Sequence, residues 1–184
     1  MAKSRAPAIA EECKRQSESC LFTSTAFFEY AKYLRDVRRW TVIIPLTLGS
    51  LASFSILANS TDPTIRVVTA LCSFVAGLIP SLRAALKADE NLDACCLYAN
   101  EFKNLQDRFR TAAQIDALKG TTELERTFNQ LREQIEALRK ASGNTPEWAF
   151  KKAQSKIKEG DYDFQIDIDA LARADENGSK PPIT

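Results

Sequence analysis

The stretch that decides the fold is "RRWTVIIPLTLGSLASFSILANS", residues 38–60. After two arginines, the twenty residues from Trp40 to Asn59 carry no charge, and a second apolar stretch, "VVTALCSFVAGLIPSL" (67–82), follows seven residues later. A twenty-residue helix is about 30 Å long, which matches the hydrocarbon thickness of a bilayer. The two stretches are therefore either two membrane spans or a buried helical hairpin in a soluble bundle.

The flanking charges favour the membrane interpretation. Basic residues precede the first stretch and follow the second: Lys32, Arg35, Arg38, Arg39, Arg83 and Lys87. The loop between the stretches has only Arg66, beside Asp62. Since Lys and Arg collect on the cytoplasmic side, we predict a transmembrane hairpin over 40–86, with spans of about 40–59 and 65–85 and both termini cytoplasmic. A soluble core would need other helices apolar enough to cover both stretches all round.

Small residues gather on one side of each predicted span. On the first span they are Thr41, Pro45, Gly49 and Ser53, and on the second Thr69, Ser73, Gly77 and Ser81. Such faces let helices pack closely in lipid. Alternatively, their hydroxyl groups line an aqueous path, which requires an oligomer because two helices are too few to enclose a pore. Neither uncharged stretch, 40–59 or 67–82, contains Asp, Glu, Lys or Arg, which argues against a proton relay or a strongly charge-selective filter.

The remainder of the chain predicts more helix, so the fold class is all-α. The sequence has only six Gly and seven Pro, and it shows no alternating strand pattern with hairpin turns. Residues 8–39 predict an N-terminal cytoplasmic amphipathic helix, in which Cys13, Cys20 and Phe27 repeat every seventh position. Residues 87–160 predict a cytoplasmic helical region. Residues 161–184 predict an acidic segment and a disordered tail.

The cytoplasmic helical region contains one short seam of apolar residues spaced 4, 3, 4 and 3. Its members are Leu124, Phe128, Leu131, Ile135 and Leu138. This spacing is typical of a helix that pairs with another helix along one stripe. The partner is either another subunit, which would make these residues an oligomer seam, or the first helix of the same subunit.

The composition gives no indication of an enzyme. There is no His, and the five Cys lack metal-ligand spacing, so we predict no catalytic, cofactor-binding or metal-ligating residue and no cofactor. An odd number of cysteines without a pairing pattern favours reduced thiols in or facing a cytoplasm. The net charge of +1 argues neither for nor against binding to nucleic acid, and we expect no nucleic-acid partner.

The layout resembles the SLATT family, two-transmembrane effectors of bacterial nucleotide-signalling conflict systems. The matching features, in chain order, are "FFEYAKYLRDVRRW", "TVIIPLTLGSLASFSIL", a short loop, "TALCSFVAGLIPSL" and "LDACCLYANEFKNLQDRFR". The resemblance covers roughly residues 15 to 140. It implies an oligomeric, pore-forming effector of antiviral defence in the bacterial inner membrane, which an upstream sensor or nucleotide-signalling protein triggers to permeabilise that membrane and abort infection.

Two other functions fit the same pattern. One is a non-conducting membrane scaffold whose cytoplasmic helices recruit a partner. The other is a phage holin, which is also small and double-spanning, although the long cytoplasmic part argues against it. The expected partners are membrane lipid, further copies of the chain and, through the resemblance, an upstream sensor.

Overall fold

The computed structural model describes residues 5–57, 62–85, 88–116 and 120–160. They form five helices: α1 (Arg5–Leu57), α2 (Pro63–Ala85), α3 (Ala88–Gln114), α4 (Thr121–Ser142) and α5 (Glu147–Lys158). These residues contain no strand, which confirms the all-α prediction. The predicted acidic segment and disordered tail, 161–184, lie outside the described residues.

Helix α1 is one uninterrupted helix of 53 residues. At 1.5 Å per residue it is about 80 Å long. The amphipathic helix predicted for residues 8–39 and most of the predicted first span are therefore consecutive parts of one helix, with no helix end between them. Pro45 lies inside α1 and removes one backbone donor, yet the helix continues through it.

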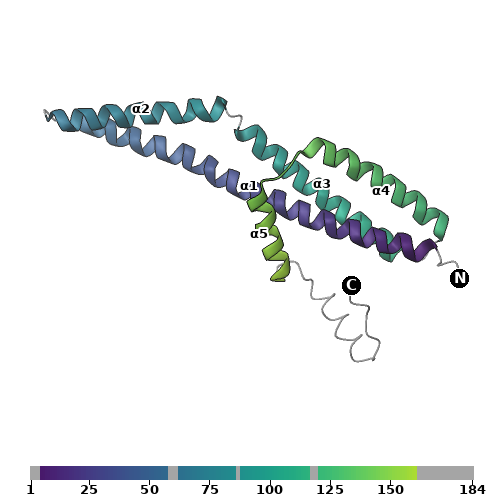
Figure 1. Cartoon of the computed structure of the whole chain (residues 1–184). Coiled ribbons are helices and arrows are strands. Elements are labelled where there is room, and N and C mark those ends of the chain that lie inside the picture. The colour runs from purple at the N-terminus through teal and green to yellow at the C-terminus, as the bar shows by residue number, and fades with distance from the viewer. Residues whose placement is uncertain (1–4, 58–61, 86–87, 117–119, 161–184) are drawn as a thin grey trace.

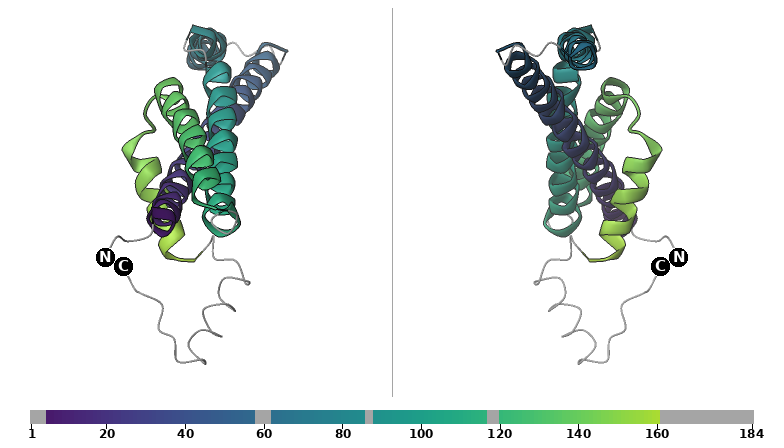
Figure 2. Two further views of the ribbon diagram at one scale, coloured as in Figure 1. Left: turned by 90° about the vertical axis from the view of Figure 1, so that its right-hand side faces the viewer. Right: turned by 90° about the vertical axis from the view of Figure 1, so that its left-hand side faces the viewer.

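The other helices are arranged around α1 (Figure 1). Helices α2 and α3 follow one another along α1, and both run against its direction. Helix α4 turns back beside α3, so that α4 and the N-terminal half of α1 flank α3 in a three-helix bundle. The C-terminal half of α1 extends beyond this bundle with α2 alone beside it, while α5 lies across the middle of α1. The end-on views in Figure 2 show the same arrangement.

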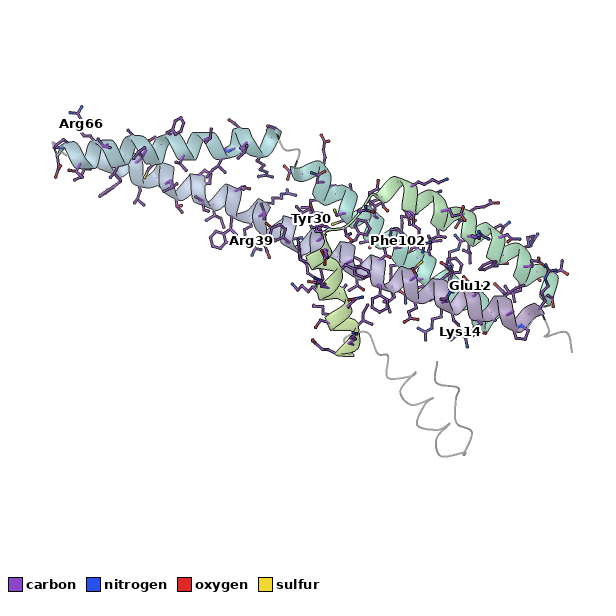
Figure 3. All side chains as sticks on the ribbon, in the orientation of Figure 1. Glu12, Lys14, Tyr30, Arg39, Arg66 and Phe102 are labelled. Carbon is purple, nitrogen blue, oxygen red and sulfur yellow. The ribbon has the colours of Figure 1, made fainter. Side chains whose placement is uncertain are left out.

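The bundle core is built from the apolar stripes of α1 and α3. On α1 the buried stripe includes Cys13, Cys20, Ser24, Phe27 and Ala31, and on α3 it includes Leu92, Cys95, Ala99, Phe102, Phe109 and Ala113. The rings of Phe27 and Phe102 stack across the interface with their centroids 5.8 Å apart, and Figure 3 shows Phe102 inside the bundle. The buried residues of α1 are thus the ones on the apolar side of the pattern in residues 8–39, and this side packs on α3.

The seam of α4 packs inside the same chain. Leu124, Leu131 and Ile135 are buried in the core, with Phe128 and Leu138 packed against it. The Phe128 ring meets Phe109 of α3 edge-on, with the centroids 6.5 Å apart. Of the two partners predicted for this seam, the structure therefore shows the one within the subunit. An oligomer contact through the same side chains would require α4 to leave the bundle.

The five cysteines are free thiols. Burial raises the pKa of Cys13 to about 11 and that of Cys20 to about 12, so both stay protonated at neutral pH. Because the thiolate is the reactive form, these two cysteines act as small hydrophobic residues of the helix interface.

The seam gives a direct test of the intramolecular packing. Leu131→Ala is expected to lower the free energy of unfolding of the full chain by about 2–5 kcal/mol, because it leaves a cavity in the core. Leu97→Ala is the matched control: Leu97 lies on α3 and is 56% exposed, and its loss should cost less than about 0.5 kcal/mol. Denaturant unfolding in mild detergent, followed by circular dichroism, measures both. Unchanged stability of Leu131→Ala with a smaller particle mass would instead assign the seam to an oligomer contact.

Candidate functional site

The part of the molecule beyond the bundle has an apolar surface. We define the apolar band as the exposed large hydrophobic side chains between residues 40 and 82. They are Trp40, Val42, Ile43, Ile44, Leu46, Leu51, Phe54, Ile65, Val67, Val68, Leu71, Phe74, Val75, Leu78 and Leu82. Soluble proteins rarely expose so large a contiguous apolar surface, whereas membrane-embedded proteins require one.

One helix of the described residues, α2, is long and apolar enough to cross a bilayer. None of its residues is fully buried in the chain. The predicted first span corresponds to the C-terminal part of α1, and its last residues, 58 and 59, lie outside the described range. The structure thus bears out one candidate span of the two that the sequence predicts.

Charged residues mark both ends of the apolar band. Figure 3 shows Arg66 at the far tip of the α1–α2 pair and Arg39 near the bundle. At the bundle end, the Arg83 guanidinium donates two hydrogen bonds to Asp89 of α3, at 2.6 and 2.7 Å. Arg38 of α1 lies 3.4 Å from the same carboxylate. Asp89 therefore ties α1 and α2 to the first turn of α3 where the apolar band begins.

The small residues predicted on α1 lie mainly on its α2-facing side. Thr41, Pro45 and Gly49 are half-buried along this side, together with the buried Ala52, while Ser53 is exposed. Thr41 and Pro45 line an open groove of about 590 Å³, and Pro80 and Arg83 line the opposite wall.

The small residues predicted on α2 fall into two groups. Thr69 is half-buried on the stripe that faces α1, which continues through Cys72, Ala76 and Ile79. Ser73, Gly77 and Ser81 are exposed on the adjacent side, and a Cβ atom added at Gly77 would have no neighbour within 4 Å. We call Ser73, Gly77 and Ser81 the exposed small face. No residue of the described chain covers it closely.

Several hydroxyl groups between residues 40 and 82 donate hydrogen bonds to carbonyl groups of their own helices. Ser53 donates to the Gly49 carbonyl at 2.9 Å, and Thr41 donates to the Arg38 carbonyl at 2.8 Å. On α2, Ser81 donates to the Gly77 carbonyl at 3.4 Å. A hydroxyl that is satisfied in this way tolerates an apolar surrounding, so these side chains are compatible with lipid as well as with a helix contact.

A buried ion cluster, which the sequence reasoning missed, holds α5 on α1. Glu29 is only 1% exposed. It accepts a hydrogen bond from Lys32 at 2.7 Å on Oε1, which also lies 3.1 Å from Lys156 of α5. The second oxygen, Oε2, forms an ion pair with Lys152 at 2.9 Å without hydrogen-bond alignment. The only sequence signals were a lone Glu on the apolar side of α1 and the lysines of α5.

The Glu29 cluster, which consists of Glu29, Lys32, Lys152 and Lys156, favours the charged form of Glu29. Burial alone raises the pKa of Glu29, but the hydrogen bond from Lys32 and the close ammonium groups of Lys152 and Lys156 outweigh it and lower the pKa to about 2. Trp148 adds an aromatic contact, with its ring centroid 5.2 Å from that of Tyr33 and 6.0 Å from that of Tyr30. Ala149 and Ala153 of α5 are fully buried, and their small side chains allow α5 to approach α1 closely.

Comparison with known proteins adds no assignment: no protein-family model, curated protein or solved structure matches the chain.

The docking of α5 depends on the charge of Glu29. Glu29→Gln should weaken it by about 1.5–3 kcal/mol, because two lysines of α5 lose their charged partner while their own ammonium groups stay partly hydrated. Glu147→Gln is the matched control, since Glu147 pairs with Lys151 at 2.7 Å on the exposed surface, where such pairs contribute at most about 1 kcal/mol. Limited proteolysis in the 143–146 connection measures the docking. Equal protection of both variants would contradict the assignment.

The same cluster predicts a pH dependence. The folded-state pKa of Glu29, about 2, lies below the value of about 4.3 for an unfolded glutamate. Its contribution is therefore complete above about pH 4.3 and is lost as the pH falls towards 2. We expect protease protection of the 143–146 connection to persist down to about pH 4 and to decline below it, as measured with an acid-active protease. A decline centred near neutral pH would contradict this.

Proposed function

We propose that the chain is a bacterial anti-phage defence effector that inserts into the inner membrane, oligomerises and makes it permeable. The observation that carries the membrane part is the apolar band, which stands beyond a folded bundle and is covered by no other described helix. In lipid, its large side chains favour insertion by about 0.3–0.6 kcal/mol each near the bilayer centre.

The proposed topology has two spans joined by a short loop, with both termini in the cytoplasm. Its support is the distribution of basic residues. Arg35, Arg38 and Arg39 lie on the bundle side of the apolar band, whereas the tip has only Arg66. Positive residues stay on the cytoplasmic side during insertion. The bundle and α5 would then face the cytoplasm and be accessible to an upstream sensor.

The proposed assembly uses the exposed small face of α2. Because α2 contacts α1 through the adjacent stripe, Ser73, Gly77 and Ser81 remain exposed in a single chain. A face of this kind lets helices from other copies approach closely or presents hydroxyl groups to water. Since one pair of helices encloses no pore, permeabilisation requires several copies around a common axis. The large residues on the opposite side of α2, which are Val68, Val75 and Leu82, would then face lipid.

The defence role rests on the layout that resembles the SLATT family: a helix leading into the membrane, two apolar segments and a long helix leading out. In this scheme the protein stays inactive until a sensor or nucleotide-signalling protein triggers it, and membrane damage then aborts infection. A scaffold that recruits a partner through the bundle without conducting is the alternative.

One double substitution separates the effector from the scaffold. Ser73→Leu with Gly77→Leu should fold, because both positions are exposed and a Cβ atom at Gly77 meets no atom. It should abolish depolarisation in expressing cells, because the added side chains fill the face that the pore requires. Val75→Leu, on the opposite side of α2 and also exposed, should leave depolarisation unchanged. A potential-sensitive dye measures the effect at equal amounts of membrane-bound protein.

Two results would count against the effector. Wild-type protein that reaches the membrane and leaves the potential intact when triggered or overexpressed would favour the scaffold. Depolarisation by the double variant at wild-type level would show that the exposed small face does not line or build the pore.

A further inference from the structure

Helix α5 lies close to the end of the apolar band and crosses the long axis of the molecule. Figures 1 and 2 show that α5 crosses the direction in which α1 and α2 extend and does not run along it. Its contact with α1 is fixed by the Glu29 cluster and by Trp148, which packs on Tyr33. If the long axis of α1 passes through a bilayer, a helix in this orientation lies parallel to the membrane surface.

The depth of α5 follows from the register of α1. Tyr33, the contact of Trp148, precedes Trp40 by seven residues, which is about 10 Å along a helix. Trp40 is the first large residue of the apolar band and is exposed. The polar headgroup region adds several ångströms beyond the hydrocarbon on each side. With Trp40 at the hydrocarbon boundary, Trp148 therefore lies at the outer edge of the headgroup layer.

The exposed surface around α5 carries the residues that bind such a layer. Residues 147–158 contain four lysines and one glutamate, and one carboxylate, Glu29, already faces three ammonium groups. Lys151 and Lys158 are exposed on α5, and Arg35, Arg38 and Arg39 are exposed on the adjoining turn of α1. Trp148 is 43% and Phe150 39% exposed. Basic residues with exposed aromatic rings are typical of helices that lie on anionic membranes.

We propose that α5 is a surface-lying helix that binds the headgroups of anionic phospholipids and thereby holds the bundle against the membrane. The inference rests on the proposed membrane insertion and extends it with a second contact to lipid. Lys151, Lys158 and the arginines of residues 35–39 bind lipid phosphates. Trp148 lies at the outer edge of the headgroup layer, and the Glu29 cluster fixes α5 at this height.

The two tryptophans of the chain, Trp40 and Trp148, allow the contact with lipid to be measured separately from insertion. Trp40→Phe leaves Trp148 as the only tryptophan, and Trp148→Phe leaves Trp40, so that excitation selective for tryptophan reports on one position at a time. Each full-length variant is reconstituted into phosphatidylcholine vesicles, with or without phosphatidylglycerol, that contain a lipid with a nitroxide quencher on its headgroup. Trp148 is expected to be quenched strongly when phosphatidylglycerol is present and at least about two-fold less without it, because the basic residues around α5 are attracted to an anionic surface.

A charge variant provides the control. Lys151→Gln with Lys158→Gln should remove the dependence on phosphatidylglycerol, whereas Lys14→Gln with Lys140→Gln, an equal loss of charge at exposed positions of α1 and α4, should preserve it. Figure 3 shows Lys14 at the far end of the bundle.

Trp148 that is unquenched in both vesicles while Trp40 is quenched would overturn the inference and leave the membrane insertion standing. Quenching of Trp148 that ignores phosphatidylglycerol would overturn the headgroup recognition. Unquenched Trp40 would overturn the insertion and the inference together.

Discussion

The apolar surface between Trp40 and Leu82 is the constraint on which the rest of the structure depends. Among the described residues, fifteen large hydrophobic side chains in this range are at least partly exposed. Fully burying one such side chain is worth about 1.5–3 kcal/mol. Since about half of each is exposed, leaving all of them in water would cost on the order of 10–20 kcal/mol. That matches the whole stability of a typical domain. The surface therefore needs a covering of lipid or of other copies of the chain. The roles proposed for the small faces, the boundary arginines and α5 all depend on this covering.

The continuity of α1 couples the two halves of the molecule. The same helix supplies the buried stripe of the bundle and one half of the apolar band, without an end or a loop between them. A helix transmits rotation and tilt along its axis, so a change in how α3 and α4 pack on its N-terminal half moves its C-terminal half as well. Asp89 adds a second link, because it binds Arg83 and lies close to Arg38 at the boundary. In the proposed effector, a trigger acting on the bundle would reach the spans through these two connections.

The sequence predicted the helices well because their signals are local and periodic. The seventh-residue repeat from Cys13 to Phe27 and the 4, 3, 4, 3 spacing from Leu124 to Leu138 each identified a face that is buried in the structure. The identity of each partner was not predictable, because an apolar stripe does not specify whether it packs within a subunit or between subunits. The Glu29 cluster was not predictable either, since it joins positions more than a hundred residues apart. The small faces were predicted as one set, but only the helix contacts divide them into α1-facing and exposed residues.

The most direct test of the central claim is whether lipid surrounds residues 40–85 in the cell. Membranes from expressing cells are washed with alkaline carbonate, which strips peripheral proteins, and the full-length protein is then located by high-speed centrifugation. The account predicts that the protein stays in the membrane pellet and enters solution only with detergent. Folded, monodisperse protein in the detergent-free supernatant would contradict it, because the apolar band would then be covered by protein and not by lipid.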